Sequence, residues 1–395
     1  MDKQAKVRNK KLDIGIFIVC LLVFITGCSK LNPHPSFLSP NNEDVYKIAV
    51  IAPQFGPYEA LGKSIIYGAE LAVEKKNKAG GINGKKIHLL KVDDGGLASE
   101  GTYRAKSLVE EKVLGVIGHL NSDISIPASE IYSKAMIVEI SPGSTNPFFT
   151  EREPVRGYVF RTVGRDDLQG KITASFVKQK GFKNIAVLYN DRGYGQSLSS
   201  EFVKEVKKTP AFANIVFYEK YKVDTMDFLK EINALKEKSP DLIYFIGEYG
   251  DGAKFLGELR KTGLKTPFLG SEGIYDIEFI KASGDAGEGA LVVSLPQVTS
   301  NEFIKAYKEK YKRDLGAYSA NSYDATNILV SAIEKIKCDK DMPWHVCVDK
   351  IAHIVSDTKD YEGLTGKLSF DEKGDLTNPA FSVYEVKSGM FRVVD

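Results

Sequence analysis

The chain has 395 residues, with 54 Lys and Arg against 52 Asp and Glu, so its formal net charge at pH 7 is +2. Without residues 1–27, 49 basic and 50 acidic side chains remain. A near-neutral chain with both signs interspersed lacks the basic footprint of a nucleic-acid-binding protein, so we expect no nucleic-acid partner. The 368 residues after residue 27 exceed one ordinary domain and predict two.

The first 28 residues have the pattern of an export signal. Five Lys and Arg precede an apolar run, residues 14–25, which is shorter than the roughly 20 residues of a membrane-spanning helix. The run ends in Ile25-Thr26-Gly27-Cys28, which resembles a bacterial lipobox, so we expect a signal peptide over residues 1–27 and lipidation of Cys28. The alternative is an uncleaved anchor helix with an incidental cysteine. The expected location is exported and lipid-anchored to the cell envelope, in the periplasm or on the outer face of the cytoplasmic membrane.

Residues 28–44 are expected to form a tether. Pro33, Pro35 and Pro40 stand among Ser and Asn residues, and no apolar period is present. Such composition is typical of a linker, and a flexible coil of this length spans on the order of 20 Å.

From residue 46 onward, short apolar runs alternate with segments that have apolar residues at helical spacing. Strands are expected at 46–53, 87–92, 113–117, 136–140, 184–189, 215–221, 241–246, 267–270 and 290–294. Helices are expected from Ile65 to a Gly80-Gly81 stop, near 99–111, 197–208, 227–238 and 252–262, and over one long region, 302–337. The alternation predicts α/β architecture with parallel sheets covered by helices on both faces, and residues 161–165 separate two such cycles.

Two small polar loops follow consecutive strands of the first cycle. His119-Leu-Asn-Ser122 follows the strand at 113–117, and Ser141-Pro-Gly-Ser-Thr145 follows the strand at 136–140. Ligands of open parallel sheets bind at the carboxyl ends of the strands, and hydroxyls with free N–H groups at a helix start suit an anion. We therefore expect these loops to hold a carboxylate-sized group. The alternative is that Ser122 is a helix cap and Thr145 a turn residue, worth about 1 kcal/mol of stability.

The segments GHLNS, PASEIYSKA and ISPGSTNP resemble the ligand-contacting region of the leucine/isoleucine/valine-binding protein family. The resemblance extends from about Lys47 to about Val386. It implies a type I periplasmic binding protein fold, with two doubly wound α/β lobes joined by a three-segment hinge. Lobe I is expected to comprise residues 45–164 and 297–370, and lobe II residues 165–296 and 371–395.

The same resemblance implies a ligand site between the lobes. Ser122 and Thr145, with backbone N–H groups near Gly143, would hold a carboxylate, and Glu272 would pair with an ammonium through charge-assisted hydrogen bonds. As isolated residues these have plainer explanations: a solvated loop Glu, a surface Tyr in a turn, or ordinary core leucines. The expected ligand-binding residues are Ser122, Gly143, Ser144, Thr145, Tyr194, Tyr249, Glu272, Leu61, Leu120 and Tyr318.

Three departures from the family pattern bear on that site. Where the family has a Tyr after the strand at 241–246, an ungapped match places Glu248, with Tyr249 one position later. Asp123 stands where a neutral residue is usual, so it must point away from a bound carboxylate or weaken its binding. Gly96 and Asn121 occupy the positions of two paired cysteines.

Cys338 and Cys347 are separated by eight residues, which suits a local disulfide in an oxidising compartment. A two-thiol metal site is the poorer alternative, because His345 is the only other candidate ligand nearby.

The chain has no G-x-S-x-G, H-E-x-x-H, P-loop or G-x-G-x-x-G motif in the required context, so we expect no enzyme, no cofactor and no metal. The leading hypothesis is a lipid-anchored solute-binding protein of an ABC importer that binds a small amino acid, branched-chain or otherwise apolar. Its partners would be that ligand, the permease subunits and, through the anchor, the membrane. The alternatives are a sensor of the same fold for an amide, urea or aromatic acid, and an enzyme of the doubly wound class.

Overall fold

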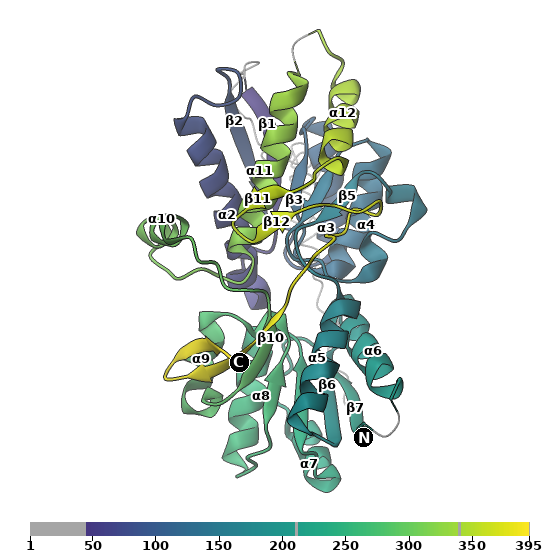
Figure 1. The fold of residues 1–395 in the computed structure, drawn as a ribbon, viewed down its shortest axis with the longest axis vertical. Helices are drawn as coiled ribbons and strands as arrows, with labels where there is room; N and C mark the ends of the chain where they lie inside the picture. The colour runs from purple at the N-terminus through teal and green to yellow at the C-terminus, as the bar shows by residue number, and fades with distance from the viewer. Residues whose placement is uncertain (1–44, 210–211, 339–340, 395) are drawn as a thin grey trace, which may run out of the picture. The chain divides into compact units, whose positions relative to one another are not determined.

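A computed structural model describes residues 45–209, 212–338 and 341–394 (Figure 1). The expected signal peptide, the lipidation site Cys28 and the tether all lie outside the described residues. Across the described ranges, no helix combines the length and the apolar character needed to cross a membrane.

The first sheet has five parallel strands in the order β2-β1-β3-β4-β5. Because helices cover both faces, its central strands are apolar on both sides, and residues 48–52 are entirely buried. The strands are β1 (Val45–Ile51), β2 (Lys86–Val92), β3 (Val116–Gly118), β4 (Glu139–Ser141) and β5 (Val159–Arg161). The helices packed around it are α2 (Glu59–Lys78), α3 (Ala98–Glu110), α4 (Ser122–Lys134), α11 (Ser319–Ile336) and α12 (Trp344–Ser356).

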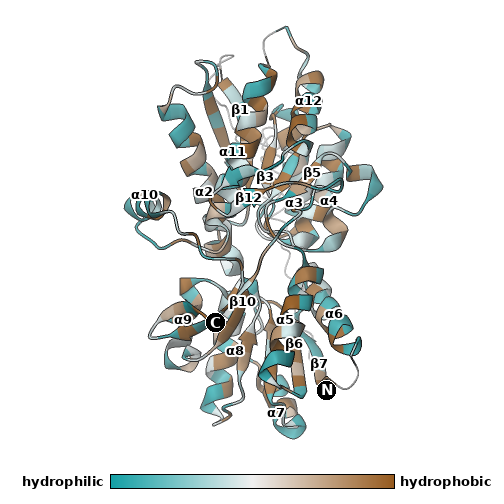
Figure 2. Ribbon diagram, viewed as in Figure 1, coloured by the Kyte–Doolittle hydropathy of each residue, from teal (hydrophilic) through white to brown (hydrophobic). Residues whose placement is uncertain are grey.

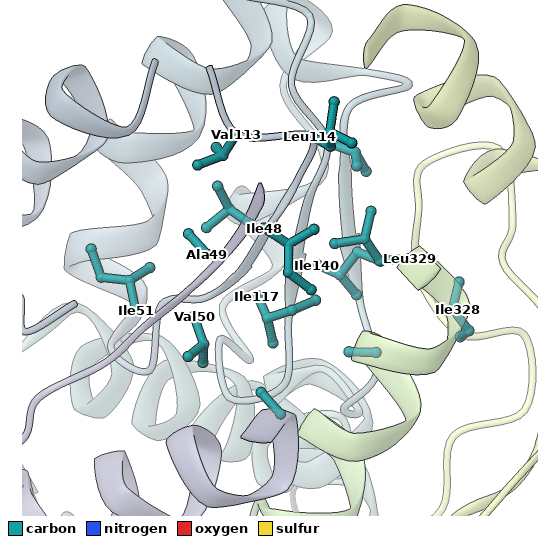
Figure 3. Packing of buried hydrophobic residues seen from close by; sticks show 14 of the residues in the cluster. Ile48, Ala49, Val50, Ile51, Val113, Leu114, Ile117, Ile140, Ile328 and Leu329 are labelled. Atoms are coloured by element: carbon teal, nitrogen blue, oxygen red, sulfur yellow. The ribbon is translucent and has the colours of Figure 1, made fainter. Parts of the chain in front are cut away.

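The core of this lobe joins residues that are distant in the sequence. Figure 3 shows Ile48, Ile117 and Ile140 from the strands beside Leu329 from α11. The C-terminal helices therefore complete a core that the N-terminal strands begin.

The second sheet has the order β14-β13-β10-β9-β8-β6-β7. Strands β6 to β10 are parallel, whereas β13 pairs antiparallel with β10 and with β14. Apolar residues concentrate along strands such as β10, and the surrounding helices carry both apolar and hydrophilic residues (Figure 2). The strands are β6 (Asn184–Asn190), β7 (Asn214–Tyr221), β8 (Leu242–Ile246), β9 (Phe268–Gly270), β10 (Leu291–Ser294), β13 (Ser382–Lys387) and β14 (Met390–Val393). The helices are α5 (Asp166–Lys180), α6 (Gly193–Lys207), α7 (Leu229–Lys238), α8 (Tyr249–Lys261) and α9 (Ile277–Ser283).

The chain passes between the two sheets three times. The first passage lies between β5 and α5, and the second between β10 and α10 (Asn301–Tyr311). The third follows the hairpin of β11 (Tyr361–Gly363) and β12 (Gly366–Leu368) and enters β13. Asp375 joins the third passage to the first, because its two carboxylate oxygens each lie 2.7 Å from a guanidinium, one of Arg161 and one of Arg165.

These features confirm the expected fold of two α/β lobes, each a sheet with its helices. The exact lobe boundaries stay a prediction. The expected single helix over 302–337 is wrong, because Lys312 adopts a left-handed conformation that ends α10. The segment between α10 and α11 also packs closely on α2, since a Cβ added at Gly316 would lie 2.5 Å from the Ser64 Cβ.

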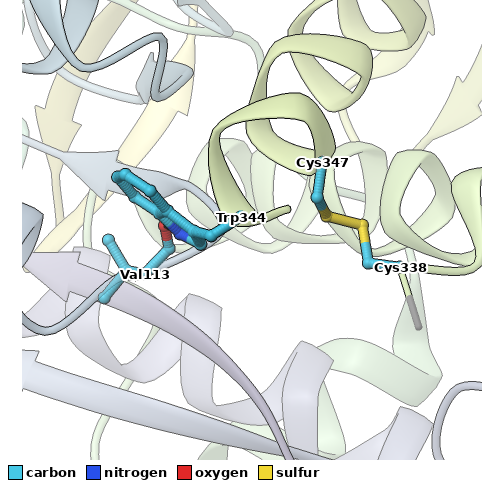
Figure 4. The surroundings of a disulfide bond; sticks show 4 residues. All are labelled: Val113, Cys338, Trp344 and Cys347. Carbon is cyan, nitrogen blue, oxygen red and sulfur yellow. A yellow bond between two sulfur atoms is a disulfide. The ribbon is translucent and has the colours of Figure 1, made fainter. Parts of the chain in front are cut away.

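A disulfide joins Cys338, just after α11, to Cys347 in α12, with a Cα–Cα distance of 5.7 Å (Figure 4). In the same region, Trp344 Nε1 donates a hydrogen bond to the Val113 carbonyl at 3.2 Å. The disulfide thus restrains the start of a helix whose first residue is also bound to the segment that leads into β3.

Candidate functional site

A pocket lies between the two lobes at the carboxyl ends of both sheets. The first lobe contributes the loops after β3 and β4 and the N-terminal ends of α2 and α11. The second contributes the loops after β8 and β9 and the first turn of α6. The lining residues are Leu61, Leu120, Asn121, Ser122, Gly143, Tyr194, Glu248, Glu272, Gly273 and Tyr318.

Most residues expected from the sequence lie in this lining, but three do not. Ser144 and Thr145 are fully buried behind it, and Tyr249 points elsewhere. Ser144 Oγ hydrogen-bonds to Ser125 Oγ, and the Thr145 carbonyl accepts from Asp166 N at 2.9 Å. The residues of the lining that the sequence interpretation missed are Asn121, Glu248 and Gly273.

On the first lobe, Ser122 is the first residue of α4, so the N-terminal end of that helix lies at this end of the pocket. The N–H groups of Ile124 and Ser125 donate to the Asn121 carbonyl, so only the N–H groups of the first two residues are oriented for a ligand. Ser122 is therefore not the helix cap; Asn121 holds that position, without a side-chain capping bond. The Gly143 N–H donates to Ser141 Oγ at 3.2 Å. Gly143 lines the pocket, and its part in binding a carboxylate stays a prediction.

On the second lobe, Glu272 is only 1% exposed, which contradicts the alternative of a solvated loop residue. It begins a short 3-10 helix after β9, and its Oε2 accepts a hydrogen bond from Tyr194 OH at 2.7 Å. Burial, reinforced by the Asp166 carboxylate, raises the pKa of Glu272 to about 8. A ligand cation at this position would favour the ionised form.

A second buried carboxylate, Glu248, lines the same wall. It precedes α8 at its N-cap and is 6% exposed, and its Oε2 accepts from Asn190 Nδ2 at 2.9 Å. Burial, with a further contribution from Asp251, raises the pKa of Glu248 to about 8. The position that holds a Tyr in the family pattern is therefore occupied in the pocket by Glu248.

Tyr249 instead spans the gap between the lobes. Its hydroxyl accepts a hydrogen bond from the Ala60 N–H at 3.3 Å. A second hydrogen bond between the lobes is donated by Asn146 Nδ2 to the Gly193 carbonyl, also at 3.3 Å. These bonds hold the lobes together beside the pocket.

Asp123 is not among the residues that line the pocket. Its carboxylate lies 3.3 Å from Arg192 Nη1 on the other lobe. Burial raises the pKa of Asp123, and the Arg192 charge opposes that effect.

The two positions that hold paired cysteines in the family pattern, Gly96 and Asn121, have different surroundings. At Gly96, with φ +67°, a Cβ would lie 2.8 Å from Tyr58 Cδ2, so the Tyr58 ring occupies the space of a side chain. Asn121 faces the pocket and is 7% exposed, and its Oδ1 has no hydrogen-bond partner in the described parts of the chain. In the sequence, the only indication that Asn121 lies in the pocket is its position between Leu120 and Ser122.

Comparison with known proteins gives consistent matches. A family model described as a periplasmic binding protein matches residues 45–390. The leucine-, isoleucine-, valine-, threonine- and alanine-binding protein of Pseudomonas aeruginosa is 32% identical over 350 residues, covering 87% of this chain and 90% of that protein. The Leu/Ile/Val-binding protein homolog 1 of Brucella abortus is 32% identical over 348 residues, with the same coverage.

Solved structures agree with these matches. A leucine-binding protein from Thermotoga maritima superposes with a TM-score of 0.80 at 27% identity, covering 89% of this chain and 98% of that one. A branched-chain amino acid transporter substrate-binding protein from Streptococcus pneumoniae, in complex with isoleucine, gives a TM-score of 0.80 at 26% identity, covering 89% and 99%.

Proposed function

The chain belongs to the leucine/isoleucine/valine-binding protein family of periplasmic binding proteins, and from that premise we propose that it is the lipid-anchored solute-binding component of an ABC importer. As a member of this family it binds a solute and is not an enzyme. The ligand that the pocket supports best is a small α-amino acid. The permease subunits of the importer are the proposed protein partners.

The observation that carries this proposal is the placement of opposite chemistry on opposite walls. Ser122 and the first turn of α4 offer hydroxyl and N–H donors on one lobe. Glu272 offers a buried carboxylate on the other. An α-amino acid carries a carboxylate and an ammonium a few ångströms apart, so it can join the two walls only when the lobes are together. Binding is thereby coupled to closure of the hinge.

Leu61, Leu120 and Tyr318 form the apolar part of the lining and would contact the carbon atoms of the side chain. The names of the relatives, which include leucine, isoleucine, valine, threonine and alanine, support an amino acid of this size. A branched-chain or otherwise apolar side chain satisfies these contacts, and the remaining polar groups of the pocket are considered below.

A thermal-shift screen of the purified mature protein against the twenty amino acids tests the proposal. At a hundredfold excess over its dissociation constant, a ligand adds about 2.7 kcal/mol to the free energy of unfolding. At roughly 2–4 °C per kcal/mol for a domain of the size of one lobe, we expect a rise in melting temperature of roughly 5–10 °C. Each responding amino acid is compared with its des-amino analogue. Equal shifts from the acid without its amine would replace the amino-acid assignment with an acid- or amide-binding one.

A further inference from the structure

Glu248 has no evident role in binding the α-ammonium or the α-carboxylate of an amino acid. Those two groups are matched by Glu272 and by Ser122 in the proposed function, on which this inference rests. Glu248 nevertheless lines the pocket and is almost fully buried. The pocket lining contains no Lys, Arg or His, so no cationic side chain of the lining faces this second carboxylate.

Most of the charged groups around Glu248 are also acidic. Asp251, Asp123 and Glu272 are carboxyl groups that act on it, and Asn190 supplies a neutral hydrogen bond to Oε2. Arg192, a nearby cation, pairs with Asp123. The wall at Glu248 is therefore rich in hydrogen-bond acceptors, and a ligand that brings a donor would complement it.

A second, independent acceptor lies on the opposite lobe. Asn121 Oδ1 is buried without a hydrogen-bond partner in the described part of the protein, and the residue lines the same pocket. A buried acceptor that stays unpaired is costly, so native structures normally satisfy it with a protein group, water or ligand. Neither Asn121 nor Glu248 gains anything from an aliphatic side chain.

We propose that Glu248 and Asn121 determine specificity, selecting an α-amino acid whose side chain carries a hydrogen-bond donor over its aliphatic isostere. The donor, a hydroxyl, amide or ammonium group, binds Glu248 from one lobe and Asn121 from the other. Leu61, Leu120 and Tyr318 contact the carbon atoms that lead to it. A pocket built to hydrogen-bond a ligand group rejects the analogue that lacks it, because its own polar atoms are then left unpaired.

Isothermal titration of the mature wild-type protein with matched pairs of amino acids tests this directly. Threonine and valine differ by a hydroxyl in place of a methyl group, asparagine and leucine compare an amide, and lysine and 2-aminoheptanoic acid compare an ammonium. We expect at least one donor-bearing member to bind at least tenfold more tightly than its partner. The pair that shows the preference identifies the donor. Equal or tighter binding of the aliphatic member in every pair would overturn the inference.

The variants Glu248→Leu and Asn121→Leu assign the preference to these residues. Each should reduce the affinity ratio of the preferred pair toward one, and Glu237→Gln, an exposed residue of α7, should leave it unchanged. If Glu248→Leu does not fold, Glu248→Gln replaces it, because a loss of the acceptor charge should still narrow the ratio. Suppose that the affinity ratio is unchanged in the Glu248 variant, that amino acids still bind, and that Glu272→Gln abolishes binding. The specificity role alone would then be refuted. Failure of every amino acid to bind would refute the proposed function with it.

Discussion

The Asp123 carboxylate, in the first turn of α4, lies 3.3 Å from the Arg192 guanidinium, which directly precedes α6 on the other lobe. The pair connects the lobes beside the pocket, together with the hydrogen bond from Ala60 to Tyr249. The aspartate next to Ser122, the serine that we propose binds a carboxylate, is thus paired with an arginine of the other lobe. The ion pair is part of the closed arrangement of the hinge.

Asp123→Asn is expected to weaken ligand binding modestly. Both side chains of the pair are about one quarter exposed, so the interaction contributes at most about 1 kcal/mol, or roughly fivefold in affinity. Titration calorimetry at low and high salt measures it, and the wild-type advantage should shrink as salt screens the pair. In a double-mutant cycle with Arg192→Gln, effects that simply add would show that the two residues are not coupled.

Ligand affinity is expected to rise with pH between about 6 and 8. The pKa of Glu272 is raised to about 8, so at lower pH its carboxyl is protonated before the ligand binds. An ammonium favours the carboxylate, so binding releases a proton, and affinity increases by at most tenfold per pH unit for each proton released. Above about pH 8 this dependence should level off. Titrations in buffers of different ionisation enthalpy count the protons, and release that is unchanged in Glu272→Gln would assign them to another group.

Replacing both cysteines of the disulfide with alanine is expected to lower the melting temperature without changing the ligand. Closing a loop this short contributes on the order of 2–3 kcal/mol in the chain-entropy model, which corresponds to roughly 4–12 °C here. Scanning calorimetry of the Cys338→Ala/Cys347→Ala variant measures this loss. Alkylation of the denatured, unreduced wild type provides the control, since two modified thiols would show that the disulfide does not form.

Cys28→Ala is expected to abolish lipid attachment and leave unprocessed or misprocessed precursor. Stable anchoring needs more than one acyl chain, because a single chain binds a membrane only marginally. Metabolic labelling with a fatty acid, followed by membrane fractionation, measures the effect. Cys20→Ala, in the apolar run, is the matched control. Label that persists in Cys28→Ala would place the modification at another residue.

Much of this fold follows from local pattern. Strands such as β8 (Leu242–Ile246) are apolar throughout because both faces of a parallel sheet are covered, and their boundaries could be predicted within a residue or two. Helix α5 could not be predicted in this way, because its buried face begins with three polar residues, Asp166, Gln169 and Thr173. Apolar periodicity gives no signal for a helix that packs against a polar interior.

The candidate site was predictable where it depends on position in the chain, and not where it depends on side-chain direction. Ser122 and Glu272 follow strands, so their proximity to the pocket could be inferred from topology. Glu248 and Tyr249 are adjacent, and only the start of α8 decides that the first lines the pocket and the second contacts Ala60. Asn121 became informative only when the structure showed that its Oδ1 lacks a partner.

The central claim is that a buried carboxylate on one lobe binds the ammonium of an amino acid. A micromolar dissociation constant corresponds to about −8 kcal/mol, and removal of one partner from a buried charge pair typically costs several kcal/mol. Titration calorimetry of Glu272→Gln with the best amino acid is therefore the most direct measurement, with Glu237→Gln as the control. We expect at least a hundredfold loss of affinity in Glu272→Gln, none in Glu237→Gln, and a folded ligand-free protein in both. Wild-type affinity in Glu272→Gln would contradict it.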